Sequence, residues 1–389
     1  MNKIMNLFIA VILLQFLVAI PDVQAETEKT PETGMLDEIS LEELQESWEL
    51  LSDEYGEYLP VNDVNDLRSL LENPEKFDSS KWIPGLLQFF LHELLANGRL
   101  LASLLFLTLF STVLQSIQNA FESTAVSRIA YMIIFLVLIT LALESFHIVI
   151  DYTVDAIDHM SSFMMGLLPL LLGIMASISH LMTVSFFHPI IIALVHTSGV
   201  LVKTVLIPLF TSSALLMIIG TLSDRYKVDQ LAQLLRNTGI ALLGAFLTIF
   251  LGVVSVQGAV TAVQDGVAIK TARFVTGNFV PVVGRLFTDA TDTILGASLL
   301  LKNTVGLAGV VIILGLALFP ALKVFAIAII YKVAAALLQP LGDGPVTQSM
   351  NIISKHIVYV FASLLMVSFM FFLLIVMLVA ASNITMMIR

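Results

Sequence analysis

The stretch IVYVFASLLMVSFMFFLLIVMLVAAS, residues 357–382, decides the fold class of this chain. It carries no Asp, Glu, Lys or Arg, and it is longer than the roughly 20 apolar residues with which an α-helix crosses a bilayer. A continuous apolar run of this length predicts a transmembrane helix.

Similar runs fill the chain from Trp82 onward. Hydrophobic residues make up 58% of the sequence and charged residues 13%, whereas soluble domains average about 45–50% and about 25%. Charges and turn residues divide the apolar part into segments. We therefore predict an all-α polytopic membrane protein over residues 82–389 with about nine transmembrane helices, at 100–118, 129–150, 160–179, 183–202, 204–222, 239–262, 304–322, 324–341 and 357–382.

The N-terminus carries an export signal. Residues 1–25 have the three regions of a secretory signal peptide. These are a positive charge at Lys3, an apolar run at 7–20 and a small-residue cleavage site at 23–25. The alternative is an uncleaved first transmembrane helix, for which the apolar run is short. We expect cleavage, which leaves the next segment outside the cytoplasm.

Residues 26–81 form an acidic extracytoplasmic segment. Ser40 and Glu43 predict a helix N-terminus, and an apolar stripe follows at helical spacing. A second short helix is predicted near Asp63. Helices this short need a surface to pack on, so the segment is either a partner-docking module or a solvated linker. The stripe consists of Leu41, Leu44, Trp48 and Leu51.

Positive charge predicts the orientation. With the acidic segment outside, the loop at Arg128 falls in the cytoplasm and the acidic loop at Asp151, Asp155 and Asp158 falls outside. The next basic loop, around Arg225, is again cytoplasmic. Nine spans then place the C-terminus in the cytoplasm.

Residues 263–303 break this pattern, because they should lie outside and yet are rich in basic residues. Glycine and proline interrupt a short apolar passage at 277–284, which predicts a broken or re-entrant helical region against protein or a water-filled cavity. The alternative is an amphipathic hairpin whose charges face lipid headgroups. Our pathway-lining or gating candidates are Asp265, Lys270, Arg273, Asn278, Pro281, Arg285, Asp289 and Asp292.

Three further polar residues lie within predicted spans. Glu144 is close enough to a helix end to reach water, and His188 and His196 could relay protons or bond to a neighbouring helix. We treat them as weaker candidates.

Several function classes are excluded or lack support. The chain has no cysteine, which excludes disulfides and thiolate metal sites. The zinc-protease pattern that starts at His92 and Glu93 has alanine at position 96, and no nucleotide-binding loop occurs. The acidic N-terminal segment argues against a nucleic-acid partner. We expect no enzymatic activity, no cofactor and no metal.

Specific motifs lie in the central part of the chain: VQG at 256–258, DG at 265–266, KTARF at 270–274, GNFVPVVG at 277–284, DATD at 289–292 and LLKN at 300–303. This run, together with the layout of signal, acidic segment and polytopic body, resembles the stage III sporulation protein AE family of endospore-forming bacilli. The resemblance covers nearly the whole chain, but it carries no established site residues.

The resemblance implies a membrane-embedded subunit of a mother cell-to-forespore channel or export complex, needed for late forespore gene expression and for forespore integrity during engulfment. The implied partners are other membrane proteins, ring-forming proteins and a separate ATPase, and the implied location is the mother-cell membrane around the forespore. Two alternatives stay open: an independent secondary transporter with a midplane site near 277–284, and a structural scaffold for the rings.

Overall fold

The computed structural model describes residues 42–59, 82–120, 125–177, 181–222, 228–279, 283–341 and 344–387. These residues contain helices and no strand, which confirms the all-α prediction. Their order is α3 (Glu42–Tyr55), η1 (Gly56–Tyr58), α5 (Trp82–Ala96), α6 (Gly98–Ala120), α7 (Ala125–Ser177), α8 (Leu181–Val200), η4 (Leu201–Leu206), α9 (Ile207–Leu222), α10 (Asp229–Phe279), α11 (Val283–Leu338), η5 (Gln339–Leu341) and α12 (Pro345–Met387).

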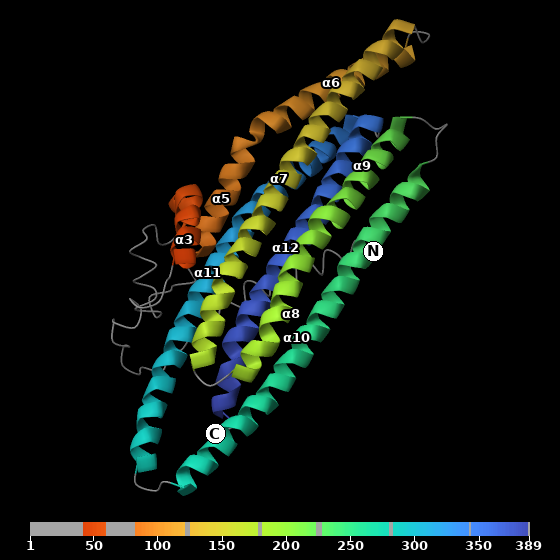
Figure 1. The fold of residues 1–389 in the computed structure, drawn as a ribbon. Coiled ribbons are helices and arrows are strands. Elements are labelled where there is room, and N and C mark those ends of the chain that lie inside the picture. The colour runs from red at the N-terminus through yellow and green to blue at the C-terminus, as the bar shows by residue number, and fades with distance from the viewer. Residues whose placement is uncertain are drawn as a thin grey trace.

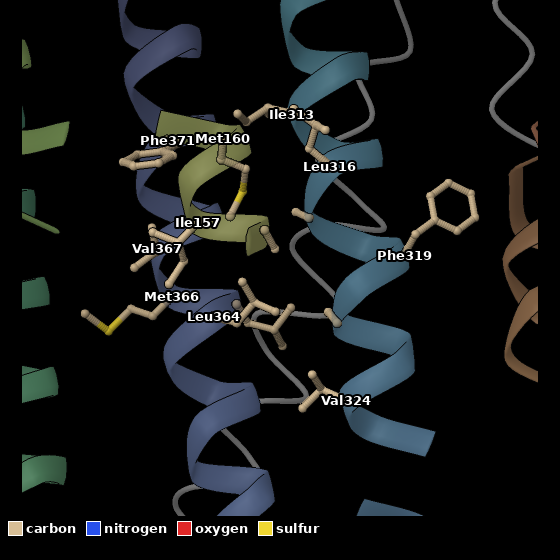
Figure 2. Close-up of a cluster of buried hydrophobic side chains, with 14 of the residues drawn as sticks. Ile157, Met160, Ile313, Leu316, Phe319, Val324, Leu364, Met366, Val367 and Phe371 are labelled. Carbon is tan, nitrogen blue, oxygen red and sulfur yellow. The ribbon is translucent and has the colours of Figure 1, made fainter. Parts of the chain in front are cut away.

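Helices α11 and α12 form the centre of the bundle (Figure 1). Glycine lets them approach closely, since a Cβ atom added to Gly306 would stand 2.2 Å from Cγ2 of Val379. Side chains such as Val324, Leu364 and Phe371 are 0% exposed at this seam, and α7 packs onto it (Figure 2). The apolar stretch at 357–382, which belongs to α12, therefore lies in the core of the protein.

The described residues contain six helices long and apolar enough to cross a membrane, so the count of nine is not confirmed. Three pairs of predicted spans are continuous: α7 covers 129–150 and 160–177, α8 to α9 covers 183–202 and 204–222, and α11 covers 304–322 and 324–338. The long apolar helices establish a polytopic α-helical membrane protein.

The predicted loop at Asp151, Asp155 and Asp158 was wrong, because all three lie within α7. Their spacing of four and three residues puts them on one exposed helix face, so the charges do not interrupt the helix. The 53 residues of α7 rise about 80 Å, far more than the roughly 30 Å of a hydrocarbon core. The orientation of the termini stays a prediction.

The polar region at 263–303 is helical on both sides of residues 280–282. Its first part continues α10 as far as Phe279, and its second part begins α11 at Val283. The two arms meet at an end of the molecule that extends past α7, α8 and α12 (Figure 1). Residues 280–282 lie outside the described residues, so the broken or re-entrant helix stays a prediction.

The N-terminal helices pack on the side of α11. Leu44, Trp48 and Leu51 of α3 are 0% exposed, as the helical stripe predicted. They pack against α11 and α7 of the same chain, so α3 is not a solvated linker, and docking on a partner stays a prediction. The predicted signal peptide, Ser40, Leu41 and the short helix near Asp63 lie outside the described residues.

Candidate functional surface

A polar stripe runs along the exposed face of α7. Its members recur every three or four residues, which keeps them on one side of the helix. Apart from Met165, they are charged, polar or small. In order they are Glu144, His147, Asp151, Asp155, Asp158, Ser162, Met165, Pro169 and Gly173.

A second stripe follows the exposed face of α8 and α9. It likewise contains small and polar side chains, with Val200 as its largest apolar member. The π-helical turn at 201–206 lies within it, and such turns are frequent at functional sites. The members are Ser185, Pro189, Ala193, His196, Val200, Thr204, Pro208 and Ser212.

An ion pair joins the two helices. Nζ of Lys203, in the π-helical turn, contacts Oδ1 of Asp158 on α7. The two helices are in contact beside this pair, because a Cβ atom added to Gly199 would lie at van der Waals distance, 3.5 Å, from Ile157 and from Ser161. We call the two stripes together the polar α7–α8 face.

Other exposed surfaces of the bundle differ in chemistry. Large apolar side chains cover α6 and the first turns of α7, where Phe106 is 68% exposed and Ile133 is 55% exposed. Ile249 and Val256 do the same on α10. Such surfaces suit lipid, whereas carboxylates and histidines do not, so the polar α7–α8 face is unsuited to hydrocarbon.

A second polar group lies where α3 meets α11. Nζ of Lys323 donates a hydrogen bond of 2.8 Å to Oε1 of Glu54, and the Tyr55 hydroxyl donates one of 2.7 Å to the same oxygen. The Lys323 ammonium also lies 5.1 Å from the ring centroids of Tyr55 and Tyr152. The Glu54 carboxylate and the two tyrosine ring faces together stabilise the Lys323 ammonium within an otherwise apolar helix.

This contact shifts the acidity of the α3 residues. Burial raises the pKa of Glu54, but the hydrogen bonds from Lys323 and Tyr55 outweigh it, and the pKa ends below its usual 4.5. Burial, with the neighbouring Glu54 carboxylate, raises the pKa of Tyr55 well above its usual value. Glu54 therefore carries its charge at neutral pH and Tyr55 keeps its proton.

Buried polar side chains join α9, α10 and α12. The Ser213 hydroxyl lies 2.7 Å from the Ala232 carbonyl oxygen and 3.1 Å from Nε2 of His356. The other ring nitrogen of His356 lies 2.8 Å from the Ile352 carbonyl oxygen. These contacts fix the three helices against one another.

The weaker sequence candidates are exposed. Glu144 and His196 belong to the polar α7–α8 face, and His188 is exposed beside Pro189. Sequence reasoning missed Asp151, Asp155, Asp158 and Lys203 as part of this face. The regular spacing from Glu144 to Gly173 was the signal that could have shown one continuous helix.

The main sequence candidates lie on the arms around residues 280–282. Of these, the structure describes the backbone and not the side chains, and Pro281 lies outside the described residues, so their role stays a prediction. Asp265, Lys270, Arg273 and Asn278 lie on α10, and Arg285, Asp289 and Asp292 lie on α11.

The described residues hold no group of three or more metal-ligating side chains. The surface chemistry of this part of the chain is instead that of ion pairs, exposed carboxylates and small residues along membrane-length helices.

Comparison with known proteins identifies the family. The family model described as stage III sporulation protein AE matches residues 63–382. The chain is 49% identical over 351 residues to stage III sporulation protein AE of Bacillus subtilis (strain 168), which covers 90% of this chain and 88% of that protein. No solved structure matches the chain. Both matches connect this membrane protein to sporulation, and the chain belongs to the stage III sporulation protein AE family.

Proposed function

We propose that the protein is a membrane-embedded subunit of a mother cell-to-forespore channel or export complex, and that its polar α7–α8 face lines the conduit. The observation that carries this proposal is the face itself. Two adjacent helices of a membrane bundle expose mainly carboxylates, histidines and small residues, with few large apolar side chains among them, whereas lipid-facing helices expose large apolar ones. The exposed large apolar members are Leu143, Ile148, Met165 and Val200.

The path runs beside the bundle and not through its centre. The seam between α11 and α12 is filled by side chains that are 0% exposed, among them Val324, Leu364, Val367 and Phe371 (Figure 2). Interiors packed in this way leave no room for a solute unless side chains are displaced. The opposite wall of the conduit is then supplied by further subunits.

The partners in this proposal are other membrane proteins, ring-forming proteins and a separate ATPase of the complex. The protein sits in the mother-cell membrane around the forespore, in contact with lipid, with its acidic N-terminal segment extracytoplasmic and its C-terminus cytoplasmic. It supports late forespore gene expression and forespore integrity. The proposal assigns it no catalytic step, no cofactor and no nucleic acid, and the family is named for a stage of sporulation and not for a reaction.

The α10–α11 arms are the proposed gate of this conduit. They extend past the neighbouring helices (Figure 1), and the residues around their junction include Gly277, Pro281 and Gly284. Arg285→Ala and Asp289→Ala should each lower the yield of heat-resistant spores while protein abundance and assembly stay normal. Normal spore yield from both variants would remove the gate from the proposal.

Obstruction of the face tests the conduit itself. Ala193 lies on the polar α7–α8 face and Ala245 lies on the outer surface of α10, and both are exposed. We expect Ala193→Trp to reduce heat-resistant spores at normal protein abundance, because the indole narrows the path. The matched control Ala245→Trp should leave the yield unchanged. Equal yields from the two variants would contradict a conduit on this face.

A further inference from the structure

The acidic helix α3 docks on a helix that is long and apolar enough to cross a membrane. Helix α11 runs from Val283 to Leu338, and α3 packs on it from Gly315 to Lys323. A Cβ atom added to Gly315 would lie 2.9 Å from Leu51, so the two helices touch closely. The contact lies between 23 and 15 residues before the end of α11 at Leu338.

The outer face of α3 is unsuited to lipid. Opposite its buried stripe, α3 exposes four carboxylates, at Glu42, Glu46, Glu49 and Asp53. An ionised carboxylate in hydrocarbon is costly, and short side chains such as Asp and Glu have little reach toward a distant headgroup layer. The part of α11 that α3 covers must therefore lie outside the hydrocarbon.

A separate helix leads to the same level of the bundle. Tyr152 of α7 lies beside Lys323, which places the neighbouring Asp151 and Asp155 at the height of the α3 contact. Both aspartates are exposed, and Asp158 one turn further pairs with Lys203 of η4. Charges of α3, α7, η4 and α11 thus lie at a similar height on this side of the bundle, and we call them the polar belt.

Helix length agrees with this position. Helix α7 contains 53 residues and α11 contains 56, and α8 continues through η4 into α9 from Leu181 to Leu222. At about 1.5 Å per residue each of these helices is at least twice as long as a bilayer core of about 30 Å. Lys203 lies near the middle of the α8–α9 helix, and Lys323 lies 15 residues before the end of α11 at Leu338.

We propose that the polar belt marks the surface at which the bundle leaves the bilayer. The belt faces water, so on the side of α3, α7 and η4 the hydrocarbon ends at this level. The docked α3 helix presents its carboxylates to the aqueous phase at this boundary and neutralises Lys323 of α11. This inference concerns the depth of the protein in the membrane and holds whether or not the α7–α8 face conducts.

Collision with paramagnetic reagents measures this depth directly. The native chain has no cysteine, so single cysteines at Glu49 and Asp155 can each carry a nitroxide in the full chain, purified and reconstituted into liposomes. We expect both nitroxides to collide more with a water-soluble nickel chelate than with oxygen, which concentrates in hydrocarbon. Both positions are exposed, so the label has room.

The controls separate depth from burial and from misfolding. A nitroxide at Leu364, which is 0% exposed, should collide little with either reagent. Circular dichroism of each labelled chain reports whether the helical content is kept. Oxygen-dominated collisions at position 49 or at position 155 in a helical, reconstituted chain would overturn the proposal.

Discussion

The ring of Tyr55 lies parallel to the ring of Phe319, with planes 4° apart and centroids 4.3 Å apart. Phe319 points from α11 toward the N-terminal helices, away from the α11–α12 seam (Figure 2). The Phe89 ring of α5 meets it edge-on at 5.1 Å. Phe319 of α11 therefore contacts both α3 and α5.

Phe319→Ala should release α3 from the bundle. Truncation of a buried phenylalanine costs about 3–5 kcal/mol, which is comparable to what a single docked helix can supply. Trp48 is 0% exposed in the docked helix, so iodide should quench its fluorescence only in the variant. The second tryptophan, Trp82, is replaced by phenylalanine in both chains. Phe106→Ala, at an exposed site, should leave quenching unchanged.

The Glu54–Lys323 pair should show unequal single-variant effects. The Lys323 side chain is only 15% exposed, so Glu54→Gln leaves an ammonium with poor solvation, whereas the double variant with Lys323→Met removes both charges. We expect Glu54→Gln to destabilise α3 docking by about 1–3 kcal/mol and the double variant by less. Trp48 quenching in denaturant series gives the values. Additive effects would mean that the pair does not couple.

Docking of α3 should weaken in acid. The pKa of Glu54 in the folded protein is below its usual 4.5, so its contribution is present above pH 4.5 and is lost as pH falls through the lower folded value. Trp48 quenching should therefore be flat through neutral pH and rise only in the acidic range. Glu54→Gln should remove this dependence on Glu54. A transition near neutral pH would point to a different titrating group.

Close packing between α11 and α12 predicts that a methyl group added at Gly306 destabilises the protein. Gly306→Ala should destabilise the protein by about 1–3 kcal/mol, because the added Cβ atom would overlap Val379. Val379→Ala should restore part of the loss by making room. Gly244 has open space around its Cα, so Gly244→Ala on α10 should be neutral or stabilising. Thermal unfolding in detergent compares the unsubstituted chain, Gly306→Ala, the double variant with Val379→Ala, and Gly244→Ala.

The Lys203–Asp158 contact predicts rescue by charge exchange. Lys203→Asp places two carboxylates beside each other and should separate α8 from α7, which lowers the yield of heat-resistant spores. Adding Asp158→Lys restores opposite charges and should recover most of the yield. If the double variant is as defective as the single one, the residues matter individually and not as a pair.

The sequence predicted local structure better than long-range arrangement. The stripe of Leu44, Trp48 and Leu51 marked a buried helix face correctly, because helical periodicity is local. Its docking surface on α11 could not be predicted, because Glu54 and Lys323 are 269 positions apart. Nothing in a single sequence states such a pairing.

The span count differed for a related reason. A hydropathy pattern divides a chain at each charge, and so it predicts boundaries between bilayer-length segments at Lys203 and Lys323. In the structure their charges are balanced by Asp158 and Glu54 from other helices, and the helices continue. The candidates at 263–303 rest on the sequence alone, and only their helical backbone is described.

The filled seam between α11 and α12 has a consequence for the size of any opening. A subunit whose centre is filled can form only one side of a passage, two helices wide, and one side alone does not determine a diameter. The diameter of a passage built from several such subunits depends on how many of them surround it. Stoichiometry, and not any one side chain, would then decide how large a molecule can cross.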